Sequence, residues 1–266
     1  MKSLYIIPDR ERIEESLQLS GKFGTYFEYN DFFLPSVLDD EVKKKDLIEF
    51  YKGLSRDRSR DTMHGAFLDV TIHSSDPKIR ETSMLRVRQS MDIAREMGIR
   101  GVIFHTNIIA NFKDKAYMDG WVEQNTRFFK GVLDEYPGIH VFMENMFDFD
   151  PDVLLQLAEN LKNEPCFGVC LDYAHARISP TPIREWLDRL SPYIKHMHIN
   201  DNDLEVDLHQ SIGQGKINYE EYTHLMKEYG IEQSVLVEVR QIEEQVASLE
   251  YMKEHRVYPL DEGRTT

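Results

Sequence analysis

The chain has 266 residues, of which 41% are hydrophobic and 30% are charged, and its formal net charge is −15. This balance is typical of a soluble globular protein rather than a disordered one, and no apolar run approaches the roughly 18 residues that a membrane span needs. The average field of such an acidic chain repels polyanions, which disfavours nucleic acid as a partner.

Apolar, β-rich runs alternate with helical patterns along the whole chain, which predicts a parallel sheet. Eight runs qualify as strands, at residues 4–7, 24–29, 62–68, 101–106, 139–145, 167–172, 194–200 and 234–239. Helix starts with proline as the first helical residue are expected at Asp76-Pro77, Asp150-Pro151 and Thr181-Pro182. Since an eight-fold (β/α) barrel uses about 250 residues, we predict a single (β/α)8 TIM barrel domain over residues 1–266.

The start of the chain contains an apolar stretch of only four residues, from Leu4 to Ile7. This stretch is too short for a secretory signal, so we expect a cytoplasmic protein. Cys166 and Cys170 lie in one predicted strand, whose extended geometry holds them too far apart to form a disulfide. We therefore expect both to be reduced, buried thiols.

Four polar residues lie at or near the downstream ends of apolar runs. Glu144 is in "IHVFMEN", Asp172 in "FGVCLD", His198 in "YIKHMHIND" and Glu238 in "SVLVEV". The residues that end successive strands of a parallel barrel converge on one face. A buried carboxylate is costly unless a cation or hydrogen-bond donors compensate its charge. The pattern therefore predicts that these four residues bind a divalent metal ion.

Further polar residues lie at strand ends or in the loops that follow. Those of metal-binding type are His64, His105, His175, Asp207 and His209, for which ligation and substrate contact both stay open. His196 is expected to be a core histidine one layer deeper. Residues expected near a small polar pocket are Asn107, Asn145 and Trp121, and the cations available for a single phosphate are Arg177, Lys216 and Arg240.

Several of these strings resemble the motifs of the xylose isomerase-like barrels. They are "VFMEN", "GVCLDYAHA", "HMHINDND", "DLHQSIGQGKI" and "VLVEV". This family includes sugar and sugar-phosphate isomerases and epimerases, and also the endonuclease IV type of enzyme that repairs abasic sites in DNA. The resemblance runs in order from about His64 to Glu238, and the first sixty residues match loosely, chiefly through "YFEYNDF".

In the isomerases and epimerases, the resemblance implies that Glu144, Asp172, His198 and Glu238 hold one divalent ion. Zn²⁺ or Mn²⁺ is favoured, with Mg²⁺ and Co²⁺ as alternatives. Glu144 and Glu238 would also act as the acid/base pair that moves a proton through an enediolate. The resemblance further implies that His175 contacts a sugar hydroxyl. Asn107, Asn145, Trp121 and Arg240 complete the expected substrate contacts.

In the endonuclease IV type, the resemblance implies three Zn²⁺ ions held by all nine candidate ligands, and a hydroxide that attacks a phosphodiester. The acidic chain and the absence of a Lys/Arg cluster interleaved with aromatics favour a small carbohydrate or its phosphate as the substrate. Two alternatives stay open, a nuclease acting on abasic DNA and a barrel that binds metal and ligand without turnover. The oligomeric state also stays open, a homo-oligomer included.

Overall fold

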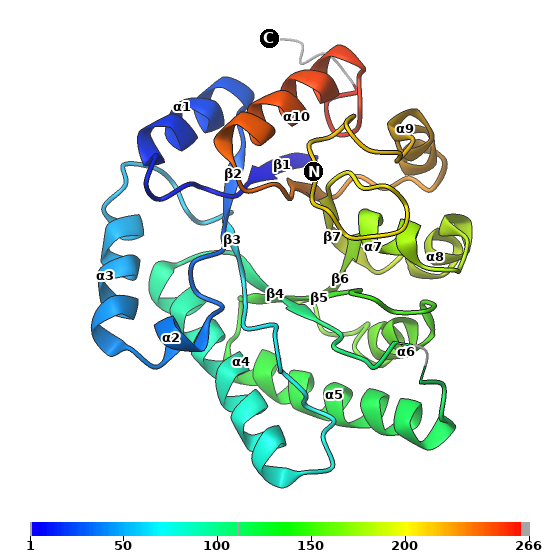
Figure 1. The fold of residues 1–266 in the computed structure, drawn as a ribbon. Coiled ribbons are helices and arrows are strands. Elements are labelled where there is room, and N and C mark those ends of the chain that lie inside the picture. Colours follow the sequence, from blue (N-terminus) through cyan, green and yellow to red (C-terminus); the bar gives the residue numbers. More distant parts are fainter. Residues whose placement is uncertain (1, 111, 262–266) are drawn as a thin grey trace. The chain divides into compact units, whose positions relative to one another are not determined.

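A computed structural model describes residues 2–110 and 112–261 (Figure 1). Eight parallel strands form a closed barrel in chain order, with helices between them, so the predicted (β/α)8 TIM barrel is confirmed. The strands are β1 (Ser3–Ile6), β2 (Tyr26–Tyr29), β3 (Thr62–His64), β4 (Gly101–His105), β5 (His140–Glu144), β6 (Phe167–Asp172), β7 (Ile194–Ile199) and β8 (Ser234–Val237).

Helices lie between the strands along the chain, as the alternating pattern predicted. They are α1 (Ile13–Phe23), α2 (Pro35–Leu38), α3 (Glu41–Lys52), α4 (Pro77–Met97), α5 (Lys115–Glu135), α6 (Asp152–Asn160), α7 (Tyr173–Ile178), α8 (Ile183–Leu190), α9 (Tyr219–Glu228) and α10 (Ile242–Glu254). Among residues 2–110 and 112–261, no helix has the length and apolar character that a membrane span requires.

One of the three predicted helix starts is confirmed. Asp76 caps α4 by accepting a hydrogen bond from the main-chain N–H of Lys78, and Pro77 is the first helical residue. At the other two starts the predicted position is wrong by one residue. Pro151 and Pro182 precede α6 and α8 instead of opening them, and Pro182 has an extended ψ of 138° that keeps it outside the helix.

The strands end close to the polar residues that the sequence singled out. His64, His105, Glu144 and Asp172 are the last residues of β3, β4, β5 and β6. β3 is shorter than the predicted segment 62–68, and β8 ends one residue before Glu238. The shortened strands therefore leave each of these side chains at a strand terminus, where the chain turns into a loop.

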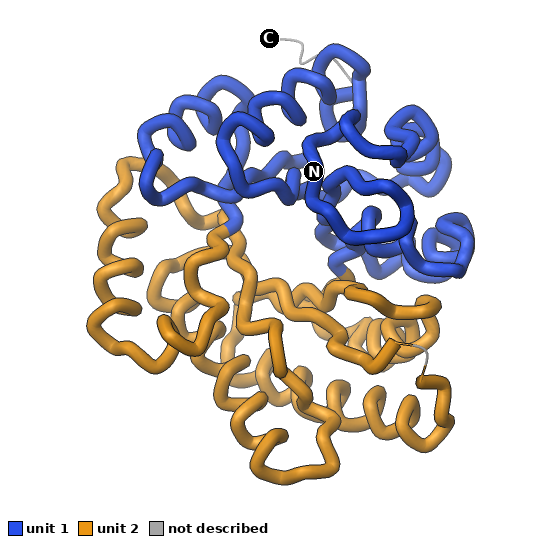
Figure 2. The backbone as a smooth tube through the Cα atoms, in the orientation of Figure 1, with its two compact units in different colours: residues 1–28, 170–266 blue, residues 29–169 orange. Residues whose placement is uncertain are grey.

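The contacts divide the chain into two compact units, drawn in different colours in Figure 2. We call residues 1–28 with 170–266 the N/C unit and residues 29–169 the middle unit. The expectation that residues 1–266 form one domain stays a prediction. Cys166 and Cys170 are both reduced thiols, Cys170 buried and Cys166 only half-buried, so the prediction of full burial is wrong for Cys166.

The two ends of the chain are joined within the N/C unit. β1 pairs in parallel with β8, with Ser3 opposite Ser234. Helices α1 and α10 lie side by side (Figure 1), and the Arg12 guanidinium forms an ion pair with Glu243 at 2.6 Å. The strand pairing matters for the site because it aligns the end of β8, and with it Glu238, beside the first strand.

Packing in the middle unit leaves no room for a side chain at Gly101. A Cβ atom at this position would lie 2.7 Å from the main-chain oxygen of His140 on the neighbouring strand β5. We expect Gly101→Ala to lower the free energy of unfolding by about 1–3 kcal/mol, because the two strands must separate. Denaturant unfolding followed by circular dichroism measures this change.

Gly131→Ala is the matched control for that substitution. Gly131 is exposed on helix α5 and a Cβ there would meet no atom within 4 Å. The control should raise stability by about 0.5–1 kcal/mol, since glycine is a poor helix former. Equal effects of the two substitutions would contradict the packing argument.

Candidate metal centre

The middle unit brings together three predicted ligands, His64, His105 and Glu144. One donor atom from each lies within 4.8 Å of the others. The Nε2 atoms of His64 and His105 are 3.0 Å apart, and His105 Nε2 lies 3.3 Å from Glu144 Oε2. These residues end three consecutive strands, and His105 is paired with Glu144 in the β4–β5 register. The parallel register therefore explains why the side chains converge.

The hydrogen bond at the other nitrogen of His64 fixes which atom faces this cluster. His64 Nδ1 lies 3.0 Å from the carbonyl oxygen of Gly65, which can only accept, so Nδ1 carries the proton. In the neutral ring Nε2 then has a lone pair directed at His105 and Glu144. A histidine oriented in this way by a main-chain carbonyl is typical of a metal ligand.

The N/C unit brings together a second group, Asp172, His198 and Glu238. Their donor atoms also lie within 4.8 Å of one another. His198 Nδ1 is 3.4 Å from Glu238 Oε2. Asp172 and His198 are fully buried and Glu238 is 9% exposed. Asp172 also caps helix α7, since its Oδ1 accepts the main-chain N–H of His175 at 2.7 Å, which fixes the direction of the carboxylate.

A third group in the same unit consists of His175, Asp207 and His209. Asp207 Oδ2 lies 3.3 Å from His175 Nε2 and 2.9 Å from His209 Nε2. His209 Nδ1 lies 3.0 Å from the main-chain oxygen of Glu238. His175 Nδ1 is 3.5 Å from Asp172 Oδ2, so the second and third groups adjoin. Each of the nine predicted ligands thus belongs to one of three groups of three.

The charge of Asp207 is matched by the two imidazole rings. Burial alone would raise the pKa of Asp207, but its hydrogen bonds to His175 and His209 lower it below the ordinary range. Burial alone would lower the pKa of His209, but the hydrogen bond to Asp207 and the charges of Glu238 and Asp207 raise it to about 10. In the metal-free protein, protons on the imidazole rings therefore provide the positive charge beside Asp207 that a metal cation would provide.

The loop that carries Asp207 and His209 is closed at its base. Asp201 and Gln210 form an antiparallel bridge through two main-chain hydrogen bonds of 2.9 and 2.8 Å. The Asp201 carboxylate accepts main-chain N–H groups from Gly213 and Ile217. Because Asp201 is fully buried, this base holds the two donor residues in place relative to β7.

The predicted substrate residues have different environments. The side-chain amide of Asn107 donates to the main-chain oxygens of Phe67 and Val70, so it fastens the loop after β3. Asn145 is buried and follows Glu144, and Arg240 is exposed. Trp121 is fully buried and its indole N–H donates to the Thr106 carbonyl at 2.9 Å. Trp121 therefore contributes to packing, and its contact with a substrate stays a prediction.

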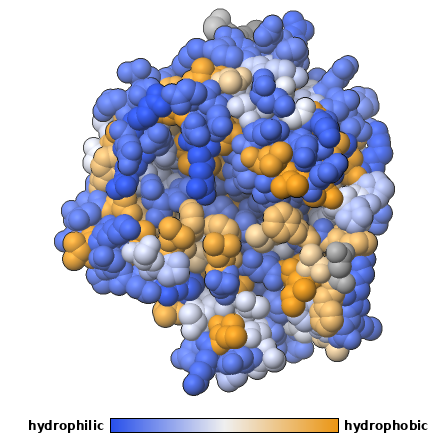
Figure 3. All heavy atoms as spheres, in the orientation of Figure 1, coloured by the Kyte–Doolittle hydropathy of each residue, from blue (hydrophilic) through white to orange (hydrophobic). Residues whose placement is uncertain are grey.

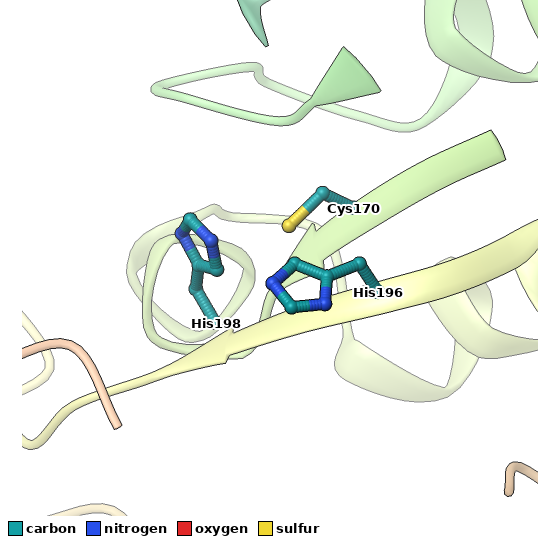
Figure 4. Close-up of side chains that lie close together, drawn as sticks. All are labelled: Cys170, His196 and His198. Atoms are coloured by element: carbon teal, nitrogen blue, oxygen red, sulfur yellow. The ribbon is translucent and has the colours of Figure 1, made fainter. Parts of the chain in front are cut away.

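Sequence reasoning missed Glu28, which ends the N-terminal part of the N/C unit. This carboxylate lies on β2 with no exposed surface, 3.1 Å from His196 Nε2 and 3.0 Å from His198 Nε2. The available signal was a glutamate inside the apolar run "YFEY". His196 is fully buried, as expected of a core histidine, and Figure 4 shows it beside His198 and Cys170.

The loops after β4 and β5 in the middle unit present apolar side chains to solvent. The exposed ones are Ile109, Phe112, Phe147 and Phe149. Figure 3 shows apolar patches interrupting a largely hydrophilic face. Lys113 in this region forms an ion pair with Asp150 at 2.7 Å and lies over the Phe149 ring. The surface of these loops is therefore apolar, and the charge of Lys113 is balanced by Asp150.

The donor set fits a divalent cation. Imidazole nitrogen and carboxylate oxygen are the ligands that Zn²⁺ and Mn²⁺ share, and no thiolate is needed. The carboxylates of Glu144 and Asp172 have no exposed surface, which is where a cation stabilises the ionised form most.

Replacing Asp207 with Asn tests the electrostatics of the third group in metal-free protein. Asn keeps the shape of the side chain but removes its charge, so the pKa of His209 should fall from about 10 toward its ordinary value of about 6.5. A raised pKa in the folded state stabilises the protein below about pH 6.5, and this contribution is lost as the pH rises toward 10. The variant should lose that pH dependence, and an NMR titration of His209 measures the shift.

Asp203→Asn provides the control on the same loop. Its carboxylate accepts main-chain N–H groups of Glu205 and Val206 and contacts neither ring. The titration of His209 should be unchanged in this variant. If Asp203→Asn shifts it as much as Asp207→Asn does, the assigned cause is wrong.

Comparison with known proteins identifies the family of the chain. The family model described as a xylose isomerase-like TIM barrel matches residues 25–255. An uncharacterized protein of Methanocaldococcus jannaschii is 26% identical over 203 residues, which cover 73% of this chain and 69% of that protein. A probable endonuclease 4 of Protochlamydia amoebophila is 34% identical over 90 residues, covering only 28% of this chain and 32% of that protein.

Two solved structures share the fold over nearly the whole length. A protein from Thermus thermophilus, soaked with ZnCl2, aligns with a TM-score of 0.72 and 24% identity, covering 95% of this chain and 96% of its own. A D-tagatose 3-epimerase-like protein aligns with a TM-score of 0.74 and 21% identity, covering 94% and 96%. Since the family model matches most of the residues, the chain belongs to the xylose isomerase-like TIM barrel family.

Proposed function

We propose that the protein is a divalent-metal-dependent isomerase or epimerase of a small sugar or sugar phosphate. The observation that carries the proposal is the group formed by Asp172, His198 and Glu238, whose donor atoms lie within 4.8 Å of one another at the ends of three strands. Membership of the family supports it, since the solved relatives include a D-tagatose 3-epimerase-like protein.

We further propose that Glu144 completes the ligand set. Residues at the carboxyl ends of the strands of a (β/α)8 barrel face the same mouth, and Glu144 is the last residue of β5. The set would then be three carboxylates and one imidazole, which suits Zn²⁺ or Mn²⁺ and is also compatible with Mg²⁺ or Co²⁺.

Glu144 and Glu238 are proposed as the acid/base pair. A bound cation would stabilise the negative charge that develops on the substrate oxygen when a proton leaves the neighbouring carbon. Glu238 is 9% exposed, so its carboxylate can exchange a proton with a substrate that enters at the strand ends. Asp172 Oδ1 accepts the main-chain N–H of His175, which leaves Asp172 to the role of ligand. Burial of Glu144 keeps water away from the carboxylate that returns the proton.

The metal content of the purified protein is the first test of this proposal. About one divalent ion per chain is expected, and dialysis against a chelator should remove it and lower the melting temperature, because a cation that binds only the folded state stabilises it. Readdition of Zn²⁺ or Mn²⁺ should restore the melting temperature. A protein that neither retains nor rebinds a divalent ion would contradict the proposal.

Replacing Glu238 with Gln tests the acid/base role. The variant should keep its fold but lose exchange of the substrate's carbon-bound proton with solvent, a loss of at least about 100-fold for a general acid/base. Solvent deuterium incorporation, followed by NMR for a panel of ketoses and aldoses that includes D-tagatose and phosphorylated sugars, measures the exchange. Glu243→Gln is the control, since that glutamate is exposed on helix α10 and forms an ion pair with Arg12. Normal exchange in Glu238→Gln would exclude the role.

A three-zinc phosphodiesterase acting at abasic DNA is the second candidate. It is favoured by the grouping of all nine candidate ligands in threes and by the similarity to a probable endonuclease 4. Two ion pairs weaken the case for the nuclease. Lys113 pairs with Asp150, and Arg177 pairs with Glu221 at 2.9 Å, so the charge of each cation is already balanced and less available to a DNA phosphate. About three zinc ions per chain together with nicking of abasic duplex DNA would favour the nuclease over the isomerase.

A further inference from the structure

A buried carboxylate joins the two histidines of strand β7. Glu28 Oε2 lies 3.1 Å from His196 Nε2 in a hydrogen bond, and Glu28 Oε1 lies 3.0 Å from His198 Nε2. All three side chains have no exposed surface. Figure 4 shows the two rings projecting to the same side of β7, next to Cys170. Glu28 therefore contacts a proposed metal ligand from inside the N/C unit.

The chemistry of the carboxylate determines the proton positions on these rings. A carboxylate oxygen 3.0 Å from a ring nitrogen repels a lone pair on that nitrogen, so Nε2 of His198 carries a proton. His198 Nδ1 lies 3.4 Å from Glu238 Oε2, in the group that includes Asp172. A cation held by this group would therefore bind His198 at Nδ1, in place of any proton that Nδ1 carries toward Glu238 in the metal-free protein.

The second ring nitrogen of His196 also has a hydrogen-bond partner. Its Nδ1 lies 2.7 Å from Ser234 Oγ, and Ser234 belongs to β8, the strand that leads to Glu238. Both ring nitrogens of His196 are engaged, so this ring is fixed and in turn fixes Glu28. The contacts form one chain, from Ser234 through His196 and Glu28 to His198.

The electrostatics of Glu28 agree with an ionised carboxylate. Two imidazole nitrogens lie within 3.1 Å of this carboxylate, which has no exposed surface, and N–H groups at that distance favour the ionised form. A neutral glutamic acid would have a proton of its own to donate and would leave the tautomer of His198 undefined.

We propose that Glu28 is a positioning residue that holds His198 as the Nε2–H tautomer, with Nδ1 directed at the metal site. The inference rests on the proposed function, because it presupposes that His198 binds a cation. Carboxylates that accept the second N–H of a ligating histidine orient the ring and increase its basicity, and their loss weakens metal binding by roughly 10–100-fold.

The rival interpretation is a separate thiolate site. Donor atoms of Cys170, His196 and His198 lie within 4.8 Å of one another, and all three residues are buried. The hydrogen bonds at both nitrogens of His196 weigh against this site, since a cation would have to displace Ser234 or Glu28 from the ring. Cys170 therefore serves as the matched control for Glu28.

Glu28→Gln and Cys170→Ala, each in the full chain, separate the two interpretations. We expect Zn²⁺ affinity, measured by chelator competition, to fall roughly 10–100-fold in Glu28→Gln and to be unchanged in Cys170→Ala. Melting temperatures of the metal-free proteins verify folding. Unchanged affinity in Glu28→Gln, or a loss in Cys170→Ala with a thiolate absorption band in the Co²⁺-loaded wild type, would overturn the proposal.

The tautomer itself can be measured in wild-type protein, which keeps the test valid if Glu28→Gln fails to fold. Long-range ¹H–¹⁵N NMR of the Zn²⁺-loaded protein should show His198 protonated at Nε2 and not at Nδ1, with the resonance assigned through its absence in His198→Asn. Protonation at Nδ1 instead would refute the positioning role alone. Wild-type protein that binds no divalent cation would remove the proposed function as well.

Discussion

Burial of carboxylates at the strand ends is the constraint on which the site depends. Asp172 and Glu144 have no exposed surface and Glu238 has little, although an ionised carboxylate is costly to bury. Such charges persist in a protein interior only where opposite charge or several donors lie close by. Imidazole rings provide these contacts around every one of them, which is why histidine and acid occur together at the ends of successive strands.

The barrel fold itself brings these residues together. The carboxyl ends of the strands lie at one edge of a parallel barrel, so polar residues at the ends of successive strands reach that edge. Additional contacts come from the segments just beyond the strands. Asp172 begins helix α7 as its cap while also facing His198, so one side chain fixes both the helix start and the group. Structural and chemical roles are therefore combined in the same residues.

Much of this was accessible from the sequence. The eight strands and the positions of Glu144 and Asp172 follow from apolar runs that end at or next to a polar residue, because both the run and its interruption can be read locally in the sequence. The end of β3 at His64 was not predicted, since the apolar run continues to residue 68. Glu28 was not identified, since a single glutamate in "YFEY" has the appearance of an ordinary outward-facing strand residue until its neighbours are known. For Trp121 the sequence did not show that its indole ring is fully buried. Which face of α5 packs inward depends on tertiary contacts that the sequence around it does not specify.

The main-chain bridge between Asp201 and Gln210 has a consequence for how such a protein diversifies. It closes the segment that carries Asp207 and His209 into a ring whose base is independent of its outer turn. Side-chain substitutions at residues 203–206 would then change the outer turn while the main-chain bridge at its base is kept. The surface of this turn can therefore diversify over the same buried Asp201 carboxylate.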